Sequence, residues 1–267
     1  MTSPVEEIEF LARSEHRVIA LRALREGPCD RDDLRASTDA SKATVARLLN
    51  EFEDRNWVVR DGHEYELTDP GEFVAEEFLR LVDRMGTEHA LRDVWQWFPT
   101  ELPGCTMSLF ADAVVTFPDS ISPYETLPRH AELMEGTRRA RAISKHTPKP
   151  STHELALHNA AAGMETEVIF PAAVIDYMLD VVDRSVIEAA VESSHLTVLE
   201  HDSLPTDVGA GLYDDRLMVA PGDEEGVVRA MVDTDKPEAV AWFESIYEEL
   251  RAEAHSVDLL ERLDEEP

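Results

Sequence analysis

The feature that most limits the fold is a helical segment followed at once by a β-hairpin, over residues 41–68. Apolar residues in 41–56 (SKATVARLLNEFEDRN) recur at spacings of three and four, which predicts a helix with one buried face: Val45, Leu48, Leu49 and Phe52. Strand-forming residues in 57–68 lie on both sides of Asp61-Gly62, a dipeptide typical of hairpin turns. Two further helices are predicted upstream, over 14–26 and over 30–37, the second capped by Asp30. Three helices followed by a hairpin predict a winged helix-turn-helix domain.

The face of the 41–56 helix opposite its apolar stripe carries side chains suited to the major groove of DNA. An Arg can read guanine and an Asn can read adenine through paired hydrogen bonds. Ser41 is the expected N-cap, and basic or polar side chains at the tip of the hairpin would contact phosphate or the minor groove. The candidate DNA-binding residues are therefore Ser41, Lys42, Thr44, Arg47, Asn50, Arg60 and His63.

Two alternatives stay open at this point. A three-helix module with a hairpin can also serve protein contacts without meeting DNA, and the order of its elements favours DNA. Arg47 could instead be a solvated side chain that pairs with Glu51, one helical turn further on.

Charge is distributed unevenly along the chain. The 267 residues carry a net charge of −31, from 25 Lys and Arg against 56 Asp and Glu. This excludes a generic basic nucleic-acid coat and a polybasic membrane binder, but not a small DNA-binding module attached to an acidic body. Residues 1–67 hold 10 basic and 15 acidic groups, so the first quarter of the chain is its less acidic part.

Lysine is scarce: Lys42, Lys145, Lys149 and Lys236 are the four in the chain. Acid-rich, Lys-poor surfaces are typical of proteins from salt-rich cytoplasms, where dense carboxylates keep a protein hydrated. An ordinary acidic protein is the alternative. The N-terminus lacks the basic and apolar pattern of a signal peptide, and no apolar run approaches the length of a membrane span, so a cytoplasmic location and no membrane partner are expected.

Beyond the first domain, three further regions are expected. Residues 69–100 form a connector with a long helix, whose stripe of Val74, Phe78, Leu81, Val82 and Met85 suggests a dimer seam. Residues 101–258 alternate between strand and helix patterns, which predicts a mixed α/β domain, and residues 259–267 form an acidic tail. The fold class is therefore α/β, or α+β over the whole chain: an N-terminal winged helix-turn-helix, a connector helix and a C-terminal mixed α/β domain.

The predicted elements of the C-terminal domain follow from these patterns. The strands are expected at 113–117, 139–144, 166–170, 196–200, 208–213, 216–220 and 227–233, and the helices at 123–135, 152–162, 172–182, 184–193 and 236–255.

Several segments together resemble a known family. EFLARSEHRVIALRALREGP at 9–28 and SKATVARLLNEFEDRNWVVRDGHEYELTDPGEFVAEEF at 41–78 resemble the N-terminal winged helix of haloarchaeal transcriptional regulators with a methanogenesis-regulator-type middle domain. Residues 91–99, 111–134 and 209–254 fit the same pattern, so the resemblance covers nearly the whole chain. It implies a homodimeric archaeal transcription factor with a small-molecule-sensing domain, in which 41–56 is the recognition helix and 57–68 the wing.

One window of the acidic C-terminal part contains no acid. Residues 136–153 (GTRRARAISKHTPKPSTH) include a predicted strand, on which Arg139 and Arg141 share a face, and a following loop with Lys145, His146 and Lys149. Arg and Lys bind phosphate and carboxylate, so these five residues are the candidate effector site for an anionic metabolite such as a sugar phosphate. The alternative is a basic loop that pairs with the protein's own acids.

Catalytic motifs are not found. HELALH at 153–158 resembles a zinc-protease motif, but its two His are five residues apart and cannot share one helix face. GxSxG, P-loop and GxGxxG patterns are absent, and the two cysteines, Cys29 and Cys105, are far apart in the chain. No catalytic residue, metal or cofactor is expected.

The sequence thus predicts a sequence-specific transcriptional regulator of a halophilic archaeon. Its expected partners are double-stranded promoter DNA, a small effector and a second copy of the chain. A metabolic enzyme with an appended winged domain and a protein–protein adaptor are the alternatives.

Overall fold

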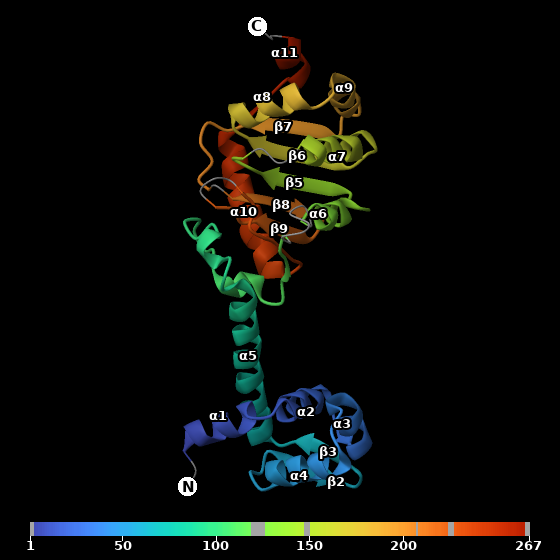
Figure 1. Ribbon diagram of the computed structural model, residues 1–267, viewed down its shortest axis with the longest axis vertical. Coiled ribbons are helices and arrows are strands. Elements are labelled where there is room, and N and C mark those ends of the chain that lie inside the picture. Colours follow the sequence, from blue (N-terminus) through green and yellow to red (C-terminus); the bar gives the residue numbers. More distant parts are fainter. Residues whose placement is uncertain (1–2, 119–125, 147–149, 207, 224–226, 265–267) are drawn as a thin grey trace. The chain divides into compact units, whose positions relative to one another are not determined.

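A computed structural model describes residues 3–118, 126–146, 150–206, 208–223 and 227–264. The chain divides into two compact units, Met1–Gly86 and Thr87–Pro267 (Figure 1). The boundary falls within one long helix, and each unit is described by itself.

The first unit contains four helices, a fifth that begins in it, and a small sheet within the described residues. Its helices are α1 (Pro4–Ala12), α2 (Glu15–Glu26), α3 (Arg31–Thr38), α4 (Lys42–Glu53) and the start of α5 (Asp69–Leu91), and its strands are β1 (Cys29–Asp30), β2 (Val58–Asp61) and β3 (Glu64–Leu67). The strands form an antiparallel sheet in the order β1-β3-β2. This is the predicted winged helix-turn-helix, with an additional helix at its start.

The core of the first unit is built from the apolar faces of these elements. Val45, Leu48, Leu49 and Phe52 of α4 are all at most 3% exposed, which confirms the predicted buried stripe. Tyr65 of the hairpin is buried with them. The short strand β1 was not predicted, because its two residues owe their conformation to pairing with β3 rather than to a local pattern.

Helix α4 is shorter than predicted at its C-terminal end. The expected helix ran to residue 56, but Asn56 adopts a left-handed conformation with φ of 57°, and the Trp57 N–H donates to the Phe52 carbonyl. Asn tolerates this conformation well and ends helices in this way. At the other end the Ser41 side chain accepts from the Thr44 N–H, as the N-cap prediction requires.

The hairpin turn also differs slightly from its prediction. Asp61 pairs with Glu64, so the two turn residues are Gly62 and His63, and Asp61 is the last residue of β2. Gly62 has φ of +60°, a conformation that Gly adopts without steric cost at the first position of a two-residue hairpin turn.

Helix α5 begins against the hairpin and continues across the boundary between the units. A Cβ on Gly71 would lie 1.9 Å from the Trp57 carbonyl oxygen, so only glycine permits this approach. The residues of the predicted dimer seam fall into a buried group and an exposed group. Val74, Phe78 and Val82 pack into the core of the first unit, whereas Leu81 and Met85 are 47% and 55% exposed.

The second unit is built around a mixed sheet. The described strands follow the order β11-β7-β6-β5-β8-β9-β10-β4, in which β5, β6 and β7 are parallel and the other pairs antiparallel. The strands are β4 (Val114–Thr116), β5 (Arg139–Ile143), β6 (Glu165–Phe170), β7 (Leu196–Glu200), β8 (Gly209–Tyr213), β9 (Arg216–Ala220), β10 (Met231–Thr234) and β11 (His255–Ser256).

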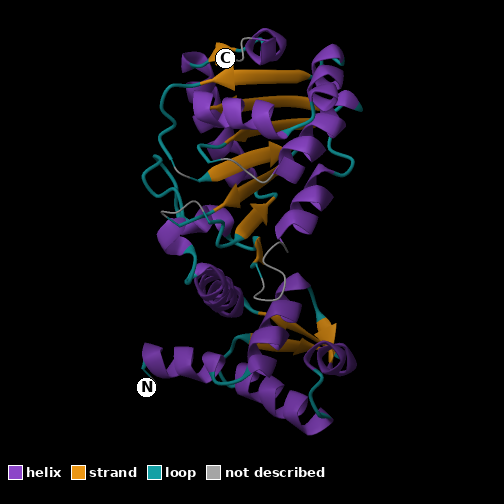
Figure 2. Ribbon diagram, turned by 45° about the horizontal axis from the view of Figure 1, so that its top comes forward, coloured by secondary structure: helices purple, strands orange, loops and turns teal. Residues whose placement is uncertain are grey.

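Helices cover both faces of this sheet, as Figure 2 shows. On one face, α7 (Pro150–Ala161), α8 (Ala172–Val181) and α9 (Arg184–Glu192) form one apolar cluster with β6 and β7. Beside them, α6 (Thr126–Met134) packs over β8, β9 and β10. On the other face, α10 (Pro237–Glu253) and the short 3-10 helices η1 (Trp95–Trp97) and η2 (Met107–Phe110) pack on the centre of the sheet.

Two segments of this unit differ from their predictions. The strand expected at 227–233 begins only at Met231, because the residues before it fold back. The Arg229 N–H donates to the Pro221 carbonyl, and the Val227 N–H donates to the Asp223 carboxylate. Part of the expected acidic tail is α11 (Leu259–Asp264), anchored by Leu259, which is 3% exposed.

A buried acid ties three elements of the second unit together. The Asp233 side chain on β10 is fully buried and accepts two bonds from Arg129 of α6, at 2.9 and 2.8 Å. It also accepts one from Arg216 Nε at 2.5 Å. The bonds to Asp233 hold the pKa of Arg129 above its ordinary value, so this guanidinium stays charged.

None of the described helices combines the length and apolarity needed to cross a membrane.

Candidate nucleic-acid interface and effector cavity

One face of α4 is free of packing. Lys42, Arg47 and Asn50 are exposed, while the opposite face is anchored in the core. Ser41 and Thr44 lie in the cap, and their hydroxyl oxygens are 2.9 Å apart. The helix therefore presents three long polar side chains from a rigid support, with two hydroxyls engaged at its N-terminus.

Arg47 has little to hold it on the protein. Its Nε lies 4.0 Å from the Glu51 carboxylate, at the outer limit of an ion pair, and 72% of its side chain is exposed. Glu51 is held instead by Arg17, at 2.8 Å. The alternative in which Arg47 is committed to Glu51 therefore has weak support in the structure.

The wing places its two predicted residues at the hairpin tip. Arg60 donates from Nε to the Gly62 carbonyl at 2.9 Å, and its guanidinium lies 5.8 Å from the centre of the Tyr65 ring. His63 is exposed in the turn. Acidic side chains surround them, and none of the three was a predicted site residue: Asp61, Glu64 and Glu66 are all exposed. The wing is therefore not a simple cationic surface.

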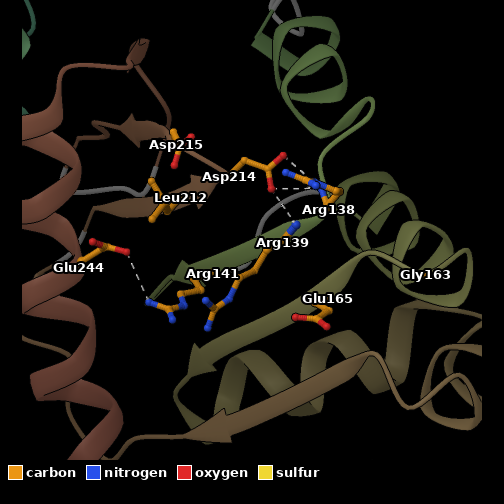
Figure 3. A pocket seen from close by; sticks show the side chains of 9 residues that line it. All are labelled: Arg138, Arg139, Arg141, Gly163, Glu165, Leu212, Asp214, Asp215 and Glu244. Carbon is orange, nitrogen blue, oxygen red and sulfur yellow. Dashed lines mark hydrogen bonds and ion pairs between the residues drawn. The ribbon is translucent and has the colours of Figure 1, made fainter.

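The second unit contains a cavity of about 570 Å³ beside α10 (Figure 3). It lies at the amino ends of β5 and β6, next to the turn after β8. Its lining residues are Arg138, Arg139, Arg141, Gly163, Glu165, Leu212, Asp214, Asp215 and Glu244. Three cations and four acids thus face one space, and the sequence predicted only Arg139 and Arg141 among them.

Arg141 is the most enclosed of the three cations. Its side chain is 12% exposed, and its Nη1 lies 3.2 Å from Glu248 and 3.9 Å from Glu244, both on α10. Beneath it, burial and the Glu167 carboxylate raise the pKa of Tyr247, so this phenol stays protonated. The Arg141 Nε is buried and has no acceptor among the described residues.

Asp214 shapes the entrance to the cavity. Its carboxylate accepts from the backbone N–H groups of Arg138 and Arg139, at 3.1 to 3.3 Å. These bonds fix the start of β5 against the β8–β9 turn, so Asp214 acts mainly on the backbone (Figure 3).

The structure divides the predicted effector residues between two ends of one strand. Arg139 and Arg141 lie in the cavity at the start of β5, whereas Lys145 and His146 follow its end. At about 3.3 Å per residue, Lys145 is roughly 13 Å along the chain from Arg141. Lys149 lies outside the described residues. Within those residues, no group of three His, Cys, Asp or Glu is placed to hold a metal ion.

Sequence comparison identifies two known domains in the chain. A family model described as the HVO_A0261 N-terminal domain matches residues 5–90, and one described as the middle domain of the methanogenesis regulatory protein FilR1 matches residues 123–253. A search of curated proteins found no match.

Solved structures resemble the chain only distantly. The archaeal chromatin protein TrmBL2, whose structure is described as showing a novel mode of DNA binding, shares 14% identity over 96% of this chain and 100% of that chain, with a TM-score of 0.42. Nuc of Salmonella typhimurium, a phospholipase D family member, shares 10% over 54% and 97%, with a TM-score of 0.41. A putative IclR-family regulator from Rhodococcus shares 16% over 90% and 93%, with a TM-score of 0.22.

Structural similarity at these scores does not indicate function, so the assignment rests on the two sequence domains and their order. The chain belongs to the family of winged helix-turn-helix regulators that join an HVO_A0261-type N-terminal domain to a FilR1-type middle domain.

Proposed function

We propose that this protein is a sequence-specific DNA-binding transcriptional regulator whose α4 reads the major groove. The observation that carries the proposal is the exposed face of α4, where Lys42, Arg47 and Asn50 stand out from a helix buried on its other side. A helix held in this way can enter a groove without losing its own packing. Arg60 and His63 extend the contact surface at the wing.

In this proposal the side chains of α4 have separate roles. Arg47 reads a guanine edge and Asn50 an adenine edge, while Lys42 binds a phosphate near the N-terminus of the helix. Ser41 and Thr44 hold that N-terminus in its capped conformation, from which backbone N–H groups can face a phosphate.

Replacing Arg47 tests this assignment directly. The preferred duplex is first selected from a random library in molar KCl, and affinity is then measured for the parent and for Arg47→Ala. We expect the variant to bind about 5- to 150-fold more weakly and to lose its preference at one base pair, because a bidentate Arg–guanine contact contributes about 1–3 kcal/mol.

A matched control is available in the same unit. Arg13 is 75% exposed and, like Arg47, has an acid one helical turn away, Glu9 at 3.3 Å, but it lies at the C-cap of α1. Arg13→Ala should bind the selected duplex like the parent. If Arg47→Ala also keeps both affinity and base preference, α4 is not the reading element.

A dimer would place two such helices on one operator. Phe73, Leu81 and Met85 of α5 are 73%, 47% and 55% exposed and lie within about 120° of one another around the helix axis, so they form an apolar line along one side of it. We propose that this line packs against its equivalent in a second copy.

Sedimentation measures that association. The parent should sediment as a dimer at micromolar concentration, and Leu81→Glu with Met85→Glu should sediment as a monomer, because two carboxylates cannot be buried there unpaired. Glu72→Gln, on the side of α5 opposite Leu81, should leave the dimer intact. A monomeric parent would remove this part of the proposal.

The second unit is proposed to bind an effector at the cavity lined by Arg139 and Arg141. A ligand there changes DNA affinity only if it binds two conformations of the protein with different affinities. The acidic, Lys-poor composition supports a halophilic host and function in its cytoplasm.

A further inference from the structure

The charged side chains around the cavity fall into two groups. Arg141 and Glu244 lie in one network with α10, and Asp214 binds the backbone. The side chains of Arg138, Arg139, Glu165 and Asp215 have no ion pair or hydrogen bond in the described part of the chain. Two cations and two anions therefore face the same space without partners.

The strand register sets the spacing of these groups. Arg139 of β5 lies directly beside Glu165 of β6, and Arg141 lies beside Glu167 two pairs further along. Paired residues on neighbouring strands project on the same face of the sheet, about 5 Å apart at their Cβ atoms. Even so, Arg139 and Glu165 form no ion pair, and Figure 3 shows both side chains beside the cavity.

An acceptor is missing at the floor of the cavity. Arg141 lines it, and its buried Nε has no acceptor among the described residues. An unsatisfied buried donor is costly, so a shift of the Arg141 side chain that brought this nitrogen to a ligand oxygen would be favourable. A carboxylate suits a position between two guanidinium groups, because each can donate to both oxygens.

The composition of the lining argues against other ligand classes. Acids outnumber guanidinium groups, so a phosphate or other pure anion would meet repulsion as well as attraction. Among the described lining residues none is aromatic and Leu212 is the one large apolar side chain, so a nucleobase or a sugar ring would find no stacking surface on them.

We propose that this cavity binds a small zwitterion of the α-amino acid type, with its carboxylate at Arg139 and Arg141 and its ammonium at Glu165. The inference rests on the proposed function, since it names the chemical class of the effector. Arg139 and Glu165 offer unpaired charges of opposite sign to the carboxylate and the ammonium, and the volume of the cavity suits a small metabolite.

Calorimetry on the full chain tests the proposal. The twenty α-amino acids are titrated in pools and then singly. The tightest ligand is compared with its N-acetyl derivative, which lacks the cation, and with its methyl ester, which lacks the anion. We expect both derivatives to bind at least about tenfold more weakly than the free amino acid.

Two variants and two controls locate the site. Arg139→Gln and Glu165→Gln should each weaken binding about tenfold or more, and both positions are exposed enough for the fold to tolerate the change. Arg184→Gln and Glu188→Gln remove an exposed pair on α9, away from the cavity, and should leave affinity unchanged.

Three results would overturn the proposal: no amino acid binds, the N-acetyl derivative binds as tightly as the free amino acid, or inorganic phosphate displaces the ligand. DNA binding is measured separately with Arg47→Ala. An amino acid that binds without changing DNA affinity supports this inference and removes the effector role. Sequence-specific DNA binding without any amino-acid binding removes this inference and leaves the DNA-binding proposal standing.

Discussion

Raising KCl from about 0.2 M to about 2 M is expected to leave the affinity for DNA level or to increase it. Proteins that neutralise several phosphates lose about a thousandfold or more of affinity over a much smaller rise in salt, because bound counterions are released. Here the proposed interface offers few cations, and the exposed acids of the wing lie beside them.

Repulsion between the polyanion and this acidic protein therefore opposes binding at low salt. At 1 M salt the screening length is only about 3 Å, so that repulsion is largely removed. The contacts that remain, hydrogen bonds to base edges and close packing in the groove, depend little on salt. Fluorescence anisotropy measures the affinity for one selected duplex at a series of KCl concentrations. The slope of log affinity against log KCl concentration then tests the expectation.

A variant with a neutral wing separates the repulsion of DNA by the wing acids from the contacts that depend little on salt. Asp61→Asn, Glu64→Gln and Glu66→Gln together should bind more tightly at low salt and lose affinity as salt rises, as ordinary DNA-binding proteins do. Circular dichroism at each concentration shows whether the chain is folded. A loss of about a hundredfold or more for the parent over this range would contradict the expectation.

Asp233→Asn is expected to destabilise the second unit by about 3 kcal/mol. Removing one partner of a buried ion pair typically costs about 3–5 kcal/mol, because the remaining charge stays buried and unpaired. The lower end applies here, since Arg129 and Arg216 are 26% and 29% exposed and can be partly solvated. For a unit of this size the melting temperature should fall by roughly 6–12 °C.

Asp235 supplies the comparison. It binds the same Arg216, at 3.1 Å, but its side chain is 77% exposed. Asp235→Asn should therefore have a much smaller effect, because exposed ion pairs contribute little. Thermal unfolding followed by calorimetry distinguishes the transition of the second unit from that of the first. Equal melting temperatures for the two variants would show that the buried ion pairs of Asp233 stabilise the second unit no more than the exposed ion pair of Asp235.

The elements with strong local signals were predicted well. The stripe of α4, the hairpin and most strands of the second unit follow from side-chain periodicity, which depends only on neighbours in sequence. Elements fixed by distant partners were missed. The strand β1 exists because Tyr65 and Glu64 pair with it, and α11 is anchored by one Leu in a cluster built from other helices.

The cavity was predicted in part for the same reason. The acid-free window pointed to Arg139 and Arg141, but the acids opposite them come from β6, the β8–β9 turn and α10. Those acids lie among many others in an acidic chain, so no local pattern distinguishes them. The pair Asp214-Asp215 between two strands was the one available signal, and it marks a turn as readily as a binding site.

The position of the cavity relative to the strand direction predicts where related proteins should differ in sequence. In doubly wound sheets, specificity is usually sought in the segments that leave the parallel strands. Here the cavity lies where β5 and β6 begin, so the residues just before each strand, including Arg138 and Gly163, border it instead. Relatives that bind different molecules would then differ in sequence just before these strands. The segments that follow the strands could vary without changing which ligand is bound.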